Sequence, residues 1–544
     1  MVNDLDLMDG RWHMEVRVHK AGGPVVQNVD EVLRQVQQKL QEQQGQWVAR
    51  LRNEPAKFAD LEAQIHRTFQ DLADQVVAGV LAQATAADDF AQDAKKKVIE
   101  QAPRKLRSAE KRSLTVRLLG GLLLCITTLY CAPAARNRGS KGRGREGSGV
   151  YPELGVLGIQ EGNSPALVRE VGRQVALLPS YAISREELAR RGLDLDIKEI
   201  YGIGKYAGQA ALTYRRRLLE QYRAGLLPAG QEWAGKRLGV FVDGGRTKIR
   251  TTTRRQQGRG QHKKQRRRYR TDWREPKVLI ICELDARGRM VPGTRAVLDG
   301  TFAGPDEVME LLAMYLHLFG AASAELVALG ADGAPWVWER WDWVIQRVGL
   351  DVRRVTKTLD WCHAVHHISL ALEHMVKDME VRRRLFKKLR KWLKQGDWLE
   401  VVVELAKLAQ DLPPDHEVWT ELSYLDRHGE AGHLDYARFR RRGVPLGSGA
   451  IESAIRRVVN QRLKGNSISW YKENAEGMLV LRCLVLSNRW DDTFEQISAS
   501  LASNRYLHGT FHSPDMTAQL KAAEIIAPPK PQVPEISASY ATAA

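Results

Sequence analysis

Two aspartates stand at the ends of short apolar segments, a position from which a side chain can reach a ligand at the edge of a sheet. Asp243 ends Arg237-Leu-Gly-Val-Phe-Val-Asp243, Asp332 ends Glu325-Leu-Val-Ala-Leu-Gly-Ala-Asp332, and a glycine follows each. Open α/β sheets place their sites at strand ends, and neighbouring strands lie ~4.8 Å apart, so the two carboxylates could bridge one metal ion. Taken singly, each aspartate is explained more simply as a cap of the following helix or turn.

A third carboxylate, Glu452, follows the glycine-rich entry Gly447-Ser-Gly449 at the start of a predicted helix. Glu452 points away from the centre of the apolar stripe of that helix, which comprises Ile451, Ile455, Val458 and Val459. Arg456 stands at i+4 from Glu452, so a surface salt bridge is the ordinary alternative for this pair. The glycine entry favours a helix end that is exposed in a cleft.

Three hard oxygen ligands from separate elements suit Mg²⁺ or Mn²⁺. Two such ions, ~3.5–4 Å apart, would activate a water or a DNA 3′-hydroxyl and stabilise the leaving oxygen in an in-line displacement. We therefore predict that Asp243, Asp332 and Glu452 are both the catalytic and the metal-binding residues of a two-metal-ion phosphodiester site. Arg456 and Arg457 would hold a phosphate beside it.

The charge of the chain suits a polyanionic partner, since 83 Lys+Arg against 65 Asp+Glu give a formal net charge of +18. The segment 246–277 beside Asp243 is strongly basic. A charge run is usually a solvated face, but the position of this one favours DNA, and each phosphate contact would steepen the salt dependence of binding. The predicted DNA-binding residues are Arg246, Lys248, Lys263, Lys264, Arg266, Arg267, Arg268, Arg456, Arg457, Arg462 and Lys464.

A mixed α/β sheet with helices on both faces must position these residues. Apolar runs predict strands over 237–243, 277–285, 290–298 and 325–332, and an apolar-striped helix over 307–318. After Asp332 the pattern is helical for more than a hundred residues, so a large helical insertion interrupts the sheet domain before Glu452.

The first part of the chain has different patterns. Amphipathic helices between residues 29 and 97 could pair subunits or pack on their own chain. Residues from Ser113 to Tyr130 alternate with period two and predict a β-hairpin. Two helical stretches around Gly192 have the outline of a helix-turn-helix with Ile197 to Arg217 as the recognition helix, and an ordinary three-helix unit fits them equally well.

Seven regions follow. They are a helical N-terminal region that could oligomerise (1–112), a β-hairpin and basic linker (113–160), a helix-turn-helix-like DNA-binding region (161–235), the first part of the catalytic domain (236–360), the helical insertion (361–443), the final catalytic helix region (444–500) and a partly disordered tail (501–544).

Five short motifs resemble the bacterial insertion-sequence transposases of the ISKra group, which are similar to Mutator-type enzymes. They are Phe-Val-Asp243-Gly, Gly-Ala-Asp332-Gly, Asp360-Trp-Cys-His363-Ala, Gly-Ser-Gly-Ala-Ile-Glu452-Ser and residues 479–487. The resemblance extends from about Ser113 to Asn488. It implies a ribonuclease-H-like core, an acidic catalytic triad carried by Asp243, Asp332 and Glu452, cleavage at transposon ends and strand transfer into target DNA. Asp360 and His363 match a (Cys or Asp)-x-x-His element and are accessory candidates, although core packing explains them as well.

Two other functions would use the same sequence features. One is a ribonuclease-H-like nuclease or resolvase that cuts without joining, and the other is a DNA-binding protein derived from a transposase that no longer cuts. The expected partners are double-stranded DNA, as transposon ends and target, and at least one further copy of the chain, because two ends must be brought together. Five scattered cysteines indicate a reducing compartment, so we expect a cytoplasmic, nucleoid-associated bacterial protein without a membrane span.

Overall fold

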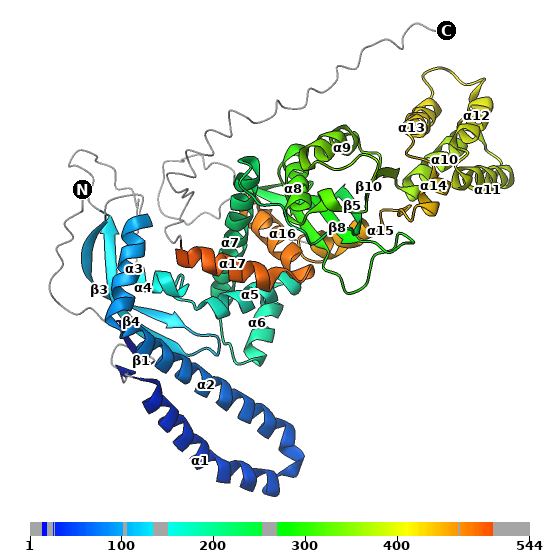
Figure 1. The fold of residues 1–544 in the computed structure, drawn as a ribbon. Coiled ribbons are helices and arrows are strands. Elements are labelled where there is room, and N and C mark those ends of the chain that lie inside the picture. The colour runs from blue at the N-terminus through cyan, green and yellow to red at the C-terminus, as the bar shows by residue number, and fades with distance from the viewer. Residues whose placement is uncertain are drawn as a thin grey trace, which may run out of the picture. The chain divides into compact units, whose positions relative to one another are not determined.

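The computed structural model describes residues 14–18, 25–26, 28–101, 106–133, 151–252, 269–465 and 468–503. These form two compact units, the first reaching to Ala211 and including the residues from Trp490 onward, and the second spanning Leu212 to Arg489. Helices and mixed sheets make up the chain, as predicted for an α/β protein (Figure 1). Among the helices within these ranges, none is both long and apolar enough to cross a membrane.

The first unit contains a four-stranded antiparallel sheet in the order β2-β1-β4-β3. Its strands are β1 (Glu15–Val18), β2 (Val25–Val26), β3 (Leu106–Arg117) and β4 (Leu123–Pro133). The predicted hairpin is β3 and β4, but β3 begins before Ser113, because main-chain pairing with β4 continues through polar residues that have no apolar alternation. Asp74 accepts hydrogen bonds from Gly120 N and Leu122 N in the hairpin turn, at 3.1 and 3.0 Å.

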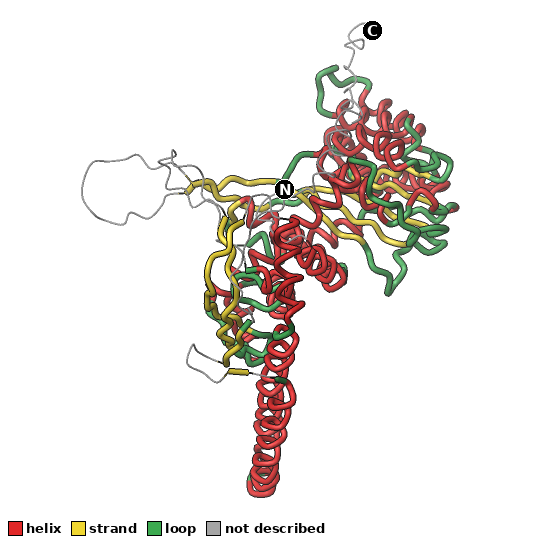
Figure 2. The backbone as a smooth tube through the Cα atoms, turned by 60° about the vertical axis from the view of Figure 1, so that its left-hand side comes forward, coloured by secondary structure: helices red, strands yellow, loops and turns green. Residues whose placement is uncertain are grey.

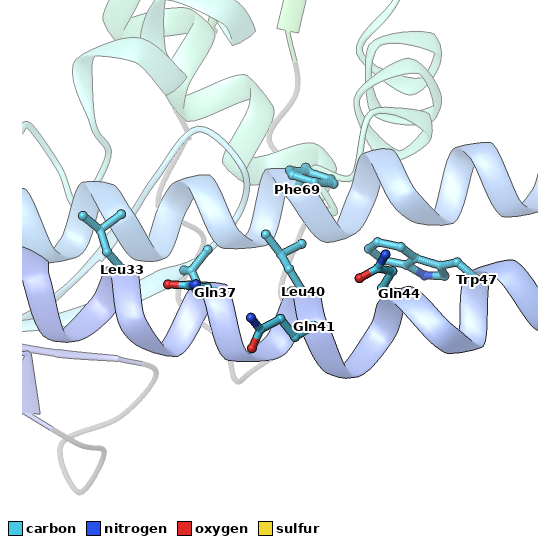
Figure 3. A pocket seen from close by; sticks show the side chains of 8 residues that line it. Leu33, Gln37, Leu40, Gln41, Gln44, Trp47 and Phe69 are labelled. Atoms are coloured by element: carbon cyan, nitrogen blue, oxygen red, sulfur yellow. The ribbon is translucent and has the colours of Figure 1, made fainter.

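Two long antiparallel helices extend from the strands of this unit as a helical arm (Figures 1 and 2). They are α1 (Val29–Asn53) and α2 (Phe58–Thr85), joined by the short helix η1 (Pro55–Lys57). A groove of about 390 Å³ runs along the arm. Figure 3 shows the apolar side chains and the glutamines that line it. The lining apolar residues are Leu33, Val36, Leu40, Trp47 and Phe69.

The remaining helices of the first unit include the predicted helix-turn-helix region. They are α3 (Asp88–Gln101), α4 (Pro152–Leu157), α5 (Pro165–Leu177), α6 (Tyr181–Arg190), the first part of α7 (Ile197–Arg223) and α17 (Trp490–Ser503). Ser164 and Ser180 cap α5 and α6 by accepting main-chain hydrogen bonds. Gly192 adopts a positive φ of 87° in the turn before α7, a conformation that favours glycine. Helix α7 continues beyond the predicted end at Arg217.

The second unit is built on a five-stranded sheet in the order β11-β10-β5-β8-β9. Strands β10 (Leu326–Ala331) and β11 (Val355–Leu359) run parallel to β5 (Arg237–Gly244), whereas β8 (Lys277–Glu283) is antiparallel to β5 and to β9 (Val297–Thr301). All residues of β10 and six of the seven in β8 are buried, which explains their continuous apolar sequences. Helices α8 (Pro305–Leu318) and α9 (Pro335–Val348) share one core with this sheet, and η2 (Ala321–Ser323) precedes β10.

Two details of this sheet differ from the prediction. The strand expected over 290–298 lies later, at β9, because residues after Glu283 form a turn with an isolated bridge between Leu284 and Met290. The segment after Asp332 is not wholly helical, since β11 follows α9. This strand is short and lies at the sheet edge. Because it contains the polar residues Thr356, Lys357 and Thr358, it lacks the continuous apolar run that predicts the other parallel strands.

The region 361–443 contains helices and connecting segments without strands. Its helices are α10 (Trp361–Met375), α11 (Met379–Gln395), α12 (Trp398–Ala409), α13 (Val418–Glu430) and α14 (Tyr436–Arg441). The chain then forms α15 (Gly449–Ile455), a π-helical turn η3 (Arg456–Asn460) and α16 (Lys472–Leu486), and a small sheet joins β6 (Thr247–Thr252), β7 (Tyr269–Arg274) and β12 (Trp470–Tyr471).

Candidate active site

Three neighbouring parallel strands each lead into an aspartate. Phe241 of β5 pairs with Gly330 of β10, so Asp243 and Asp332, two residues further on, stand at the same level. Asp360 follows β11 in the same way, and its main-chain N donates to Ala331 O at 2.9 Å. The structure therefore brings the two strand-end aspartates of the sequence analysis side by side and adds Asp360 next to them.

All three aspartates belong to one face of the sheet, because successive strand residues point to opposite faces. Val242 and Ala331 belong to the core shared with α8 and α9, so Asp243 and Asp332 fall on the other face. Val355 packs against that core too, which places Asp360 with the other two aspartates. Helix α15, which carries Glu452, packs against β5 and β8, and its buried residues lie outside that core.

The electrostatics of Asp243 reflect these neighbours. Its carboxylate accepts a hydrogen bond from Gly244 N at 2.6 Å. Burial raises the pKa of Asp243 to about 6, the Gly244 hydrogen bond and the charge of His363 lower that pKa, and the negative charge of Asp332 raises it further. The Asp332 carboxylate accepts from Ala334 N at 3.1 Å, so its predicted capping role also occurs.

Glu452 lies on the exposed side of α15, while Ile451 and Ile455 are buried as the apolar stripe predicted. Its carboxylate accepts a hydrogen bond from Ser448 Oγ at 3.2 Å. Burial raises the pKa of the Cys362 thiol, and the negative charges of Asp360 and Glu452 raise it further.

Asp360 is buried and connects the third parallel strand to the Glu452 helix. One carboxylate oxygen accepts from His363 N at 2.9 Å and caps α10, and the other accepts a short hydrogen bond from Ser448 N, the residue that precedes α15. The main-chain N of Trp361 also donates to Leu446 O, at 2.8 Å. Asp360 is thus a positioning residue, whereas the His363 side chain lies within electrostatic range of Asp243.

A tyrosine of the helical insertion, which was not among the predicted site residues, approaches the loop after Asp332. A side chain at Gly333 would meet the Tyr424 hydroxyl, and Gly333 has a positive φ of 55°. Burial raises the pKa of Tyr424, and the negative charge of Asp332 raises it further. The His367 ring stacks on Tyr424 with 3.6 Å between centroids and is hydrogen-bonded to Glu421. This contact spans the sheet and insertion, so no local sequence pattern signals it.

The predicted DNA-binding residues fall into three groups. Arg246, Lys248, Arg456, Arg457 and Lys464 are exposed or half-buried. Arg462 is buried with its guanidinium 5.0 Å from the centroid of the Trp470 ring, so its side chain packs inside the protein. The remaining five, Lys263, Lys264, Arg266, Arg267 and Arg268, lie outside the described residues.

Carboxylate oxygens are the ligands that Mg²⁺ and Mn²⁺ prefer in proteins. Asp243 and Asp332 offer two such carboxylates in a partly buried place where the charge of Asp332 disfavours ionisation of Asp243, and a divalent cation would relieve that repulsion. In the parts of the chain that the structure describes, no group of three His, Cys, Asp or Glu side chains is arranged around a single metal position. The sheet brings Asp243 and Asp332 together, and Glu452 lies on α15, hydrogen-bonded to Ser448 Oγ.

Comparison with known proteins adds no assignment to this geometry. No family model matches the chain. No curated protein matches it either. The carboxylates at the strand ends therefore carry the functional argument.

Proposed function

We propose that this chain is a DNA transposase that cleaves DNA at transposon ends and transfers the strands into target DNA. The observation that supports this most directly is the pairing of Asp243 and Asp332 at the ends of adjacent parallel strands, on the face packed by the Glu452 helix. Two carboxylates in mutual repulsion suit divalent metal ions, and the excess of 18 positive charges suits DNA.

The strand arrangement also favours a ribonuclease-H-like core, of the kind that the ISKra resemblance implies. Three antiparallel strands (β5, β8, β9) come first in the chain, and two strands parallel to the first (β10, β11) follow on its other side. Within that core Asp243 and Asp332 would hold one metal ion, and Glu452 would complete the second site. The ions, when bound, would activate a water or a 3′-hydroxyl and stabilise the leaving oxygen.

Other residues of the chain have supporting roles in this proposal. Asp360 accepts a hydrogen bond from Ser448 N, the residue before α15, and would position Glu452 relative to the strand ends. Arg456 and Arg457 follow Glu452 on η3 and would bind the phosphates that flank the cleaved bond. His363 lies close enough to Asp243 to influence its charge and would stabilise the ionised carboxylate.

Conservative substitutions test the catalytic proposal. We expect Asp243→Asn, Asp332→Asn and Glu452→Gln to abolish cleavage and joining while DNA binding survives, because the carboxylates hold the metal ions and basic surfaces hold the DNA. The assay uses a supercoiled plasmid that carries the genomic element with both flanks, a target plasmid and Mg²⁺, and it scores nicked, excised and joined products. Asp415→Asn, an exposed aspartate in the insertion, is the matched control. Full cleavage by a variant removes that residue from the triad, and cleavage without joined ends favours a nuclease.

We also propose that a second copy of the chain occupies the groove of the helical arm. Leu33 and Val48 of α1 are 47% and 48% exposed. The first turn of α1 is acidic (Asp30, Glu31) and its last turn is basic (Arg50, Arg52), so an antiparallel pair of α1 helices would place opposite charges together at both ends. Such a dimer would hold two transposon ends in one complex.

A further inference from the structure

The chain leaves the sheet at Asp243 and enters a small antiparallel ribbon that the catalytic proposal does not use. Strand β6 begins four residues after Asp243 and pairs with β7, with Lys248 opposite Trp273 and Arg250 opposite Thr271. Strand β12 joins the other edge of β6. The ribbon therefore starts at one of the proposed metal ligands.

One face of the ribbon is anchored to the segment that follows the Glu452 helix. Thr247 and Ile249 are buried on this inner face. Thr247 Oγ1 donates to Leu463 O at 2.7 Å, and Trp470, which pairs with Ile249, donates from Nε1 to the same carbonyl at 3.1 Å. Strand β5, which carries Asp243, and the segment that follows α15 both connect to the ribbon. The ribbon therefore has a fixed position beside the candidate site.

The outer face of the ribbon carries cations and exposed aromatic rings. Strand alternation places Arg246, Lys248 and Arg250 on this face, opposite the buried residues. The Arg246 guanidinium and the Lys248 ammonium lie 5.4 and 5.0 Å from the centroid of the Trp273 ring. The Arg250 guanidinium lies 4.2 Å from the Tyr269 centroid, and its Nε donates to Ser469 Oγ at 2.8 Å.

Both aromatic residues remain about half exposed despite these contacts, Trp273 at 48% and Tyr269 at 52%. The acidic residues of β7 and its end are partly neutralised, since Asp272 pairs with Arg270 at 3.0 Å and Glu275 with Lys277 at 3.2 Å. A ribbon that needed only internal stability would gain little from exposed cation–π pairs, because such pairs are weak at the protein surface.

We propose that the outer face of β6 and β7 binds single-stranded DNA, with bases stacked on Trp273 and Tyr269 and phosphates held by Arg246, Lys248 and Arg250. Exposed ring faces favour unpaired nucleotides over a duplex, because stacking requires an accessible base face whereas duplex binding requires only the cations. If the chain has the proposed function, these nucleotides belong to the strand next to the cleaved bond. The binding itself does not rest on that function.

The test measures the affinity of the full chain for a fluorescein-labelled oligothymidylate and for a labelled duplex of the same length, by fluorescence anisotropy. We expect Trp273→Ala to weaken binding of the single strand about fivefold or more, the effect of losing one stacked base, while duplex affinity changes less than twofold. Trp273→Phe keeps an aromatic face and restores most of the affinity. Phe58→Ala, which removes an exposed ring from the helical arm, leaves both affinities unchanged.

Three results would overturn the proposal. They are unchanged affinity of Trp273→Ala for the single strand, an equal loss for both DNA forms, and failure of Trp273→Phe to restore binding. The Asp332→Asn variant separates this proposal from the catalytic one. Its affinity for the single strand stays at the wild-type level whether or not the chain is a transposase, and only its cleavage reports on the proposed function.

Discussion

Replacing Asp360 by alanine perturbs two elements at once, because its buried carboxylate accepts hydrogen bonds from His363 N and Ser448 N. Loss of the α10 cap costs about 1 kcal/mol. Leaving the buried N–H of Ser448 without its side-chain acceptor costs about 2 kcal/mol more. We therefore expect Asp360→Ala to lower the free energy of unfolding of the second unit by about 3 kcal/mol, and Asp360→Asn, which keeps one acceptor oxygen, to lower it less.

Urea denaturation followed by tryptophan fluorescence measures the loss of stability, since four tryptophans lie in α9 of the same unit. Hydrogen exchange of the amides in 448–455 measures whether the Glu452 helix is released with α10. Asp378→Ala is the matched control, because Asp378 caps α11 through Glu380 N and Val381 N but has an exposed position. It should cost less stability than Asp360→Ala and leave exchange in 448–455 unchanged. The reasoning fails if Asp360→Ala behaves like this control.

Two further predictions follow from the site and the arm. With EDTA present, Asp243→Asn should be more stable than the wild type above about pH 6 by up to about 3 kcal/mol and equally stable below about pH 4. Burial raises the pKa of Asp243 in the folded chain from 3.8 to about 6, so ionisation of this carboxyl destabilises the folded wild type as the pH rises through that window. Equal denaturant midpoints for the wild type and Asp243→Asn at pH 8 would contradict this prediction. Leu33→Glu should convert a dimer to a monomer in light scattering at micromolar concentration, because the substitution buries a charge in the groove. Val352→Glu, at an exposed position of the second unit, should leave the measured mass unchanged. A dimeric Leu33→Glu variant would exclude this interface.

The strand-end aspartates could be predicted because β5 and β10 are buried on both faces. Their sequences are continuous apolar runs, and the first polar residue after each run marks the end of the strand. Strand β11 could not be predicted in this way, since Lys357 in its middle is half-buried and pairs with Asp342 of α9 at 2.6 Å. An edge strand of five residues with polar positions has little sequence signal.

Contacts between distant segments account for the rest of what the sequence could not predict. The hydrogen bond between Asp360 and Ser448 joins residues 88 positions apart. Tyr424 reaches Gly333 from the insertion, although nothing near either residue indicates the pairing. Arg462 belongs to a basic segment and reads as exposed, yet its guanidinium packs over Trp470 inside the protein. Charge patterns identify neither burial nor partner when the partner comes from another element.

The helical insertion has its two ends fastened together. It leaves the sheet at Asp360 and returns at Ser448, and the Asp360 carboxylate and the Trp361–Leu446 hydrogen bond join the two points. Helices α10 to α14 therefore form an insertion whose ends are held together, so its length does not affect where Asp332 and Glu452 lie relative to each other. A chain that gained or lost a helix within the insertion would still reach the sheet at Ser448. This segment can therefore vary in size and surface while the positions of Asp332 and Glu452 are kept.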